Sequence, residues 1–114
     1  MRAVGGIVVL LMAGCAAPEP RPNPIAFSLD AGGIQLLDRP QRVDFGRTDH
    51  STLSAMTKLT ASDPMREGAC VGGGRYAAFG DGVALHFARG DFVGWSRREQ
   101  DGTIRQAGRA CVQA

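Results

Sequence analysis

Four of the six prolines in this chain fall within seven residues, at positions 18, 20, 22 and 24. Proline fixes the backbone angle φ and has no N–H to donate, so the segment cannot form a helix or a central strand and favours an extended polyproline II path. We therefore expect residues 15–24 to act as a tether. The remaining residues, 25–114, are enough for one small domain and leave no room for a second.

The composition is that of an ordinary globular chain. Hydrophobic residues make up 44% of the sequence and charged residues 21%, values at which disorder is not expected. The formal net charge is only +2. Because so small a charge produces no strong field of one sign, we expect no nucleic-acid partner and no binding to acidic lipid through charge alone.

The first fifteen residues carry a targeting signal. Arg2 is followed by an apolar run over residues 3–13, which is shorter than the roughly 20 residues of a membrane-spanning helix but is typical of a signal-peptide core. The run ends in Leu-Met-Ala-Gly-Cys at residues 11–15, which resembles the lipobox of bacterial lipoproteins. The resemblance implies that residues 1–14 are removed and that Cys15 carries the lipid. The alternative is an ordinary signal peptide cut a few residues later, or an uncleaved short anchor.

The lipobox resemblance also implies a location. Cys15 is followed by Ala16 and not by the Asp that retains many such lipoproteins in the inner membrane. In a bacterium with two membranes, this implies an outer-membrane lipid anchor with the domain facing the periplasm. A diacylglyceryl group together with an N-acyl chain gives a stable attachment that one acyl chain alone does not.

Beyond residue 25, apolar spacing predicts short strands. Residues 26–29 and 34–36 alternate apolar and polar side chains around a Gly-rich turn, which predicts a hairpin. Val43 and Phe45 indicate a further short strand. Gly- and Asp-containing turns then separate four more segments with strand patterns, at residues 76–79, 83–88, 92–96 and 103–105.

One helix is predicted between these strands. Three apolar side chains recur at three-residue spacing: Leu53, Met56 and Leu59. This spacing predicts a helix over residues 48–62, with the side chain of Thr48 or Asp49 capping its first turn. The fold class is therefore expected to be α+β, with a small antiparallel sheet of about four to six strands and one helix packed across a face.

The cysteines predict one disulfide. With Cys15 assigned to lipid, Cys70 and Cys111 remain, and an exported protein meets an oxidising compartment, so we expect these two to pair. The alternative is a free Cys70 acting as a nucleophile with His86 as its base.

Other motifs favour structural roles. Gly-Gly-Gly-Arg at residues 72–75 precedes a predicted strand and not a helix, so we expect a turn and not a P-loop. Arg-Gly-Asp at residues 89–91 has the composition of a tight turn. His50 and His86 have no partner at metal-ligand spacing, and His86 is expected to be a solvated or edge residue. We predict no metal, no cofactor and no enzymatic activity.

Three residues are candidates for contacts with a partner: Arg75, Tyr76 and Trp95. We first expect Tyr76 and Trp95 to pack with Phe92 in a core cluster, because aromatic side chains dominate cores. An exposed docking patch is the alternative, since aromatic residues also anchor interfaces.

Residues 70–96 resemble a segment of small exported bacterial proteins of unassigned function. In those proteins a Cys- and Gly-rich turn leads to a strand, a Gly-Asp-Gly-like turn, a strand ending in Phe and a return strand that reads Phe-x-Gly-Trp. Here these features are residues 70–75, 80–82, Phe87 and residues 92–95. The order of helix and then hairpins is also similar to that of the small outer-membrane lipoproteins of the β-barrel assembly machinery. These resemblances imply a fold and no particular activity.

We therefore expect a non-catalytic lipoprotein that binds an envelope protein or glycan, or that takes part in envelope assembly. An alternative comes from Gly-Gly-Arg-Tyr at residues 73–76 and the aromatic-rich hairpin after it. This step is similar to one in the lipid-anchored inhibitors of host lysozyme. That resemblance implies inhibition of lysozyme or of another hydrolase.

Overall fold

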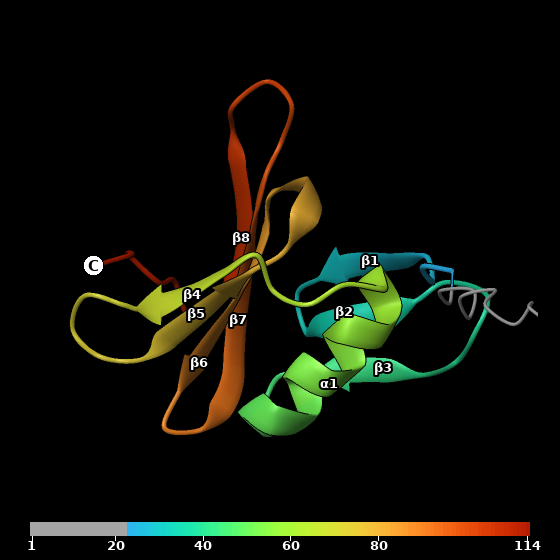
Figure 1. Cartoon of the computed structure of the whole chain (residues 1–114), viewed down its shortest axis with the longest axis horizontal. Helices are drawn as coiled ribbons and strands as arrows, with labels where there is room; N and C mark the ends of the chain where they lie inside the picture. The colour runs from blue at the N-terminus through green and yellow to red at the C-terminus, as the bar shows by residue number, and fades with distance from the viewer. Residues whose placement is uncertain (1–22) are drawn as a thin grey trace, which may run out of the picture.

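The computed structural model describes residues 23–114 (Figure 1). The predicted signal peptide, the lipidation site at Cys15 and the tether as far as residue 22 lie outside the described residues, so all three stay predictions. Within the described part of the chain, no helix combines the length and the hydrophobicity that crossing a bilayer requires.

Residues 27–44 form the first of two sheets. Its antiparallel strands are β1 (Phe27–Asp30), β2 (Gly33–Leu36) and β3 (Arg42–Asp44), in the order β1-β2-β3. The predicted hairpin around residues 30–33 is confirmed. The sheet buries its alternating apolar side chains, which are Leu29, Ile34 and Val43.

The predicted helix is α1 (Asp49–Thr60), which ends two residues before the expected position 62. The hydroxyl of Thr48 accepts a hydrogen bond from the N–H of Ser51 at 3.2 Å, so Thr48 is the capping residue. The helix ends because Ala61 has φ 57° and ψ 30°, a left-handed conformation that cannot continue a right-handed helix.

Residues 66–108 form the second sheet. Its five antiparallel strands follow one another in space as in sequence: β4 (Arg66–Ala69), β5 (Arg75–Ala78), β6 (Val83–Ala88), β7 (Asp91–Arg98) and β8 (Ile104–Gly108). A short 3₁₀ helix, η2 (Gly80–Gly82), connects β5 to β6. Arg89 and Gly90, both with positive φ, connect β6 to β7. The Arg-Gly-Asp tripeptide is thus part of a tight hairpin, as predicted.

The expectation of one α+β sheet is correct only in part. The strands are antiparallel and α1 is present, but the strands form two sheets and dominate the described residues, so the fold is mostly β. Apolar alternation identifies strands and does not say which strands pair, and α1 separates β3 from β4 along the chain. β4 was not predicted because Arg66 and Glu67 are exposed and the strand has no apolar alternation.

One core lies between the two sheets and α1 (Figure 1). We call the side of the five-stranded sheet that carries the paired residues Ala77, Leu85 and Trp95 the inner face, because it faces this core, and the opposite side the outer face. The buried core residues are Leu29, Ile34, Val43, Met56, Leu59, Ala77, Phe79, Val83, Leu85, Phe87, Phe92 and Trp95. The predicted stripe of α1 therefore faces the core through Met56 and Leu59.

Candidate functional site

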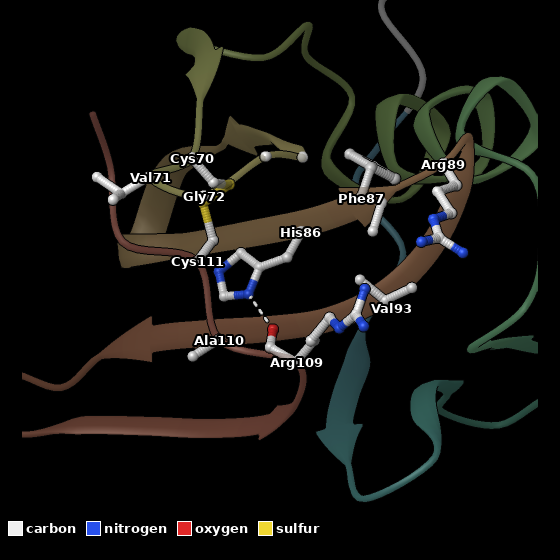
Figure 2. Close-up of a pocket in the computed structure, with 13 residues that line it drawn as sticks. Cys70, Val71, Gly72, His86, Phe87, Arg89, Val93, Arg109, Ala110 and Cys111 are labelled. Atoms are coloured by element: carbon white, nitrogen blue, oxygen red, sulfur yellow. Dashed lines mark hydrogen bonds between the residues drawn. A yellow bond between two sulfur atoms is a disulfide. The ribbon is translucent and has the colours of Figure 1, made fainter.

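The chain continues beyond β8, and residues 109–113 cover part of the outer face; we call this segment the C-terminal clasp. A disulfide joins Cys111 of the clasp to Cys70 after β4, with the two Cα atoms 5.4 Å apart (Figure 2). The predicted pairing is thus confirmed. The N–H of Val71 donates to the carbonyl of Val112 at 2.7 Å. The clasp is therefore fastened by a covalent bond and by backbone hydrogen bonding.

Gly94 on β7 makes room for the clasp. A Cβ atom at this position would overlap with the backbone nitrogen and oxygen of Arg109. Because Gly94 has no side chain, the clasp backbone lies directly on the strand, and the N–H of Arg109 donates to the carbonyl of Val93 at 2.8 Å. This close approach is a physical reason for glycine in the Phe-x-Gly-Trp sequence of β7.

His86 lies beneath the clasp and is only 3% exposed. Its Nδ1 lies 2.8 Å from the carbonyl oxygen of Arg109 and must be the donor, because a carbonyl only accepts. In the neutral ring, Nε2 then accepts from the hydroxyl of Ser96 at 3.2 Å. Burial lowers the pKa of His86 below its usual 6.5, so the ring is neutral at pH 7. The expectation of a solvated His86 was wrong, because a segment distant in sequence covers it.

The alternative of a Cys70 nucleophile with His86 as base does not fit this geometry. The sulfur of Cys70 is bonded to Cys111. Both ring nitrogens of His86 already have hydrogen-bond partners. The two residues instead hold the clasp on the sheet.

A hollow of ≈ 420 Å³ lies beside the clasp. We call it the basic hollow, because Arg89 and Arg109 line it and no Asp or Glu is among its described lining residues. In Figure 2, Arg89 enters from the β6–β7 turn and Arg109 from the clasp, with Val93 between them in the view. The lining residues are Cys70, Val71, Gly72, Gly73, Gly74, His86, Phe87, Ala88, Arg89, Val93, Arg109, Ala110 and Cys111.

A β-bulge shapes one wall of the basic hollow. The register between β6 and β7 shifts between His86 and Phe87, so that Phe87 pairs with Phe92. Phe92 is fully buried in the core, whereas its neighbour Val93 lines the hollow. The bulge thus supplies an apolar wall to the outer face without removing an aromatic ring from the core.

A second groove, of ≈ 450 Å³, shares His86 and Cys111 with the basic hollow. Arg66 and Arg98 line it, and again no carboxylate is among its described lining residues. Its rim is more apolar, because two exposed side chains belong to it: Met65, 75% exposed, and Ile104, 56% exposed. The outer face therefore combines basic and apolar groups.

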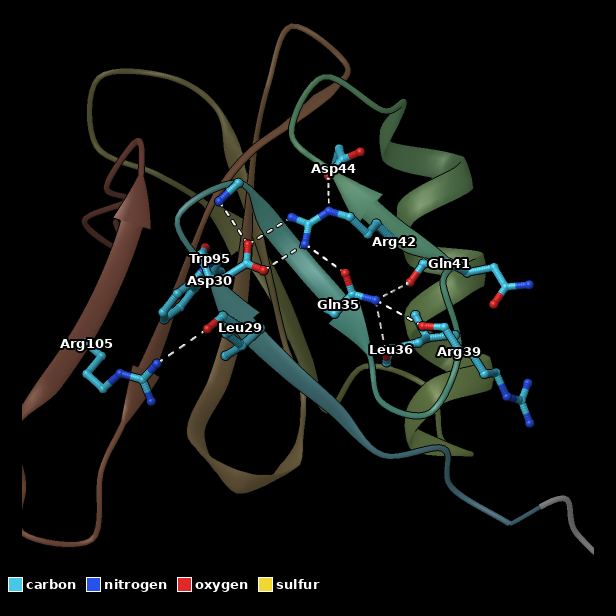
Figure 3. Close-up of polar contacts among 11 residues, drawn as sticks. Leu29, Asp30, Gln35, Leu36, Arg39, Gln41, Arg42, Asp44, Trp95 and Arg105 are labelled. Carbon is cyan, nitrogen blue, oxygen red and sulfur yellow. Dashed lines mark hydrogen bonds and ion pairs between the residues drawn. The ribbon is translucent and has the colours of Figure 1, made fainter.

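The three predicted contact residues do not lie together. Trp95 is buried on the inner face, where its Nε1 donates to the carbonyl of Asp30 at 2.7 Å (Figure 3). Tyr76 is buried on the outer face with its ring over Gly68. Only Arg75 is exposed. Both aromatic rings are buried, as first expected, but the expected single cluster was wrong: Trp95 lies in the core with Phe92, whereas Tyr76 lies on the opposite face of the sheet. A contact between Arg75 and a partner stays a prediction.

The ion pair between Asp30 and Arg42 stabilises the first sheet (Figure 3). Nη1 and Nη2 of Arg42 donate to the two carboxylate oxygens of Asp30 at 2.8 and 2.9 Å, and Nε donates to Asp44 at 2.7 Å. The bond to Arg42 lowers the pKa of Asp30 to about 2. Gln35 accepts from Arg42 at 3.0 Å and donates to carbonyls of the β2–β3 connection. Because Asp30 is partly exposed, we expect this cluster to contribute little beyond holding the connection.

The other sequence candidates have structural roles. The glycine turn at residues 72–74 leads into β5, so it is not a P-loop, as predicted. His50 is exposed on α1. Among residues 23–114, no three His, Cys, Asp or Glu side chains come close enough to hold a metal ion.

No family model matches this chain, and neither do the curated proteins or the solved structures compared with it. The candidate site is the outer face, where the basic hollow and the second groove lie. Arg89 and Arg109 were not predicted as site residues, because they lie on segments far apart in sequence. The cysteines could have indicated this site, because pairing Cys70 with Cys111 places the glycine turn next to residues 109 and 110.

Proposed function

We propose that this protein is an outer-membrane-anchored periplasmic lipoprotein that acts as a non-catalytic binding module, with the outer face as its binding surface. The lipobox at residues 11–15 supports the anchor. The clasp supports the binding role, because the disulfide fixes residues 109–113 on the sheet and the two grooves beside them are preformed. A preformed surface loses less conformational entropy on binding than a flexible one.

The observation that carries the proposal is the composition of the two grooves. Arginine lines both of them, carboxylates line neither among the described residues, and Met65 and Ile104 add exposed apolar area. Arginine and apolar anchors are typical of binding surfaces. An envelope protein or glycan with acidic groups fits this face.

The Cys70 and His86 pair, which was the catalytic alternative, is used to hold the clasp. His86 is neutral and hydrogen-bonded through both ring nitrogens, and Cys70 is in a disulfide. This use of the two residues favours binding over catalysis.

Site-specific photo-crosslinking of the full chain in cells tests the proposal. A photoreactive residue would replace Val71 at the basic hollow or Ile104 at the second groove, both of which are exposed. The matched control would be Ser54, which is exposed on α1 away from both grooves. We expect the same adduct from both outer-face positions and none from position 54. Equal adducts from position 54, or none from the outer face, would contradict the proposal.

The lysozyme-inhibitor interpretation has less support. Of the Gly-Gly-Arg-Tyr step that carries the resemblance, Arg75 is exposed but the ring of Tyr76 is buried. Trp95, the third candidate contact, is buried on the other face. Inhibition of lysozyme stays a prediction.

A further inference from the structure

The basic hollow carries a more specific inference, which rests on the binding role proposed above. We propose that it binds a phosphate monoester group, held by the guanidinium groups of Arg89 and Arg109 beside the glycine turn at residues 72–74. Charge, backbone fixation and free amide donors each support this assignment.

The charge of the basic hollow suits a dianion. The ion pairs among residues 23–114 involve Arg42 and Arg105, so neither Arg89 nor Arg109 is neutralised by a described carboxylate. Asp91 follows Arg89 by two residues but does not line the hollow. A phosphate monoester carries about −1.5 to −2 charges at pH 7, which matches two guanidinium groups better than the single charge of a carboxylate does.

The backbone that carries each guanidinium is fixed. Arg109 is hydrogen-bonded through its N–H to Val93 and through its carbonyl to His86. Arg89 lies in a tight turn whose next residue, Gly90, accepts from the N–H of Asp49 at 2.8 Å. Planar guanidinium groups can donate two hydrogen bonds each to phosphate oxygens, and the two side chains start from backbone positions that line the same hollow.

The glycine turn adds amide donors at the wall of the hollow. Its three residues have φ values of 83°, 108° and 89°, which glycine adopts without strain. Within residues 23–114, the N–H of Gly73 donates to Cys70, whereas those of Gly72 and Gly74 have no acceptor. The two N–H groups without an acceptor belong to residues that line the hollow, and backbone N–H groups can donate to an anion.

The second groove fits this ligand less well. Nη2 of Arg66 donates to the side chain of Gln113 at 3.3 Å, and its guanidinium carbon lies 5.8 Å from the ring centroid of Tyr76. One of its two arginines is therefore already engaged. Exposed Met65 and Ile104 give its rim an apolar character.

The test is a titration of the full chain in detergent solution, followed by the NMR shifts of backbone amides at constant ionic strength. The probes are inorganic phosphate, glucose 1-phosphate and, as a monoanion control, acetate. We expect both phosphates to bind more tightly than acetate and to shift the amides of residues 72–74. Arg89→Gln and Arg109→Gln should each weaken phosphate binding at least about tenfold, the usual cost of removing a hydrogen bond to a charged group.

Arg39→Gln is the matched control, because Arg39 is also exposed and lies on the β2–β3 connection of the other sheet. We expect this variant to bind phosphate as the parent does. The same loss in Arg39→Gln would overturn the proposal, because it would indicate long-range attraction without a site. Equal affinity for acetate, or no shift at residues 72–74, would also overturn it. Outer-face crosslinks obtained alongside such a result would leave the broader binding role intact.

A parallel measurement identifies where the phosphate group comes from. Vesicles that contain phosphatidic acid present the same phosphate monoester on a lipid. Vesicle binding that Arg89→Gln and Arg109→Gln abolish would place the group on a lipid headgroup. Binding of glucose 1-phosphate without vesicle binding would place it on a soluble sugar or glycan. Both results support the proposed ligand chemistry.

Discussion

His86 is a buried polar residue whose environment is set by atoms far away in sequence. It lies on the face of β6 opposite to Leu85 and the core, as alternation along a strand requires. The sequence did not reveal that the outer face is covered there, because the covering atoms belong to Arg109. Side-chain direction is a local property of a strand, whereas burial depends on what packs against it.

We predict that His86 makes stability depend on pH between about 7.5 and 5.5. Its folded-state pKa is lowered from 6.5 by burial, so the unfolded chain binds the proton more readily. The stabilising contribution is thus present above 6.5 and is lost as the pH falls below it. Urea unfolding at the two pH values should show a lower free energy of unfolding at the acidic one.

His86→Gln should reduce this difference, and His50→Gln, at the exposed histidine of α1, should preserve it. Asp30 does not interfere, because its pKa falls from 3.8 to about 2 on folding and its contribution is lost only in that lower range. An unchanged difference in His86→Gln would contradict the assignment.

The C-terminal clasp is an element without regular secondary structure over most of its length, and its sequence has no apolar period. Its pairing with Cys70 was nevertheless predictable from the number of cysteines left after Cys15. The path of the clasp across the sheet could not be predicted, because it depends on Gly94 having no side chain. β4 could not be predicted for a related reason. Backbone pairing with β5 holds this strand, and its mostly exposed side chains leave no apolar pattern in the sequence.

We expect Cys70→Ser combined with Cys111→Ser to release the clasp and lower stability. The bond spans 41 residues, for which the chain-entropy model gives a loss of up to about 4 kcal/mol in the free energy of unfolding. Urea unfolding measures that loss. Amide hydrogen exchange should become faster at Val71, whose N–H donates to the clasp, and at Arg109, whose N–H donates from the clasp to β7. The amides of β6 should stay protected.

Unchanged exchange at Val71 and Arg109 in the double variant would mean that the clasp does not depend on the disulfide. The double substitution is preferable to either single one, because it leaves no unpaired thiol to form mixed disulfides.

At the scale of the whole molecule, two sheets share one core, and Trp95 joins them by donating to Asp30. The sequence predicted most of the strands and the helix, yet it could not predict this division. Pairing is decided by contacts between distant segments, and the same strand patterns are compatible with one sheet or two. Residues 15–24 are expected to connect this domain to the membrane.

Cys15→Ala tests that connection. If lipid on Cys15 holds the protein, we expect the variant to move from the membrane to the soluble periplasmic fraction, as measured by cell fractionation and immunoblotting. Ala16→Asp should keep the protein membrane-bound but shift it to the inner membrane, following the rule of the lipoprotein family. Continued membrane retention of Cys15→Ala would contradict the anchor.

The position of the disulfide has a mechanical consequence. Residues 70–111 form a closed covalent ring that contains β5, β6, β7 and β8. A pull between an anchored amino terminus and a partner bound to this ring would pass through the segment before Cys70, which the disulfide does not close and which holds β1, β2, β3, α1 and β4. Under tension this segment would extend first. The disulfide would limit the extension of residues 70–111, so the binding surface would stay intact and the partner would stay bound.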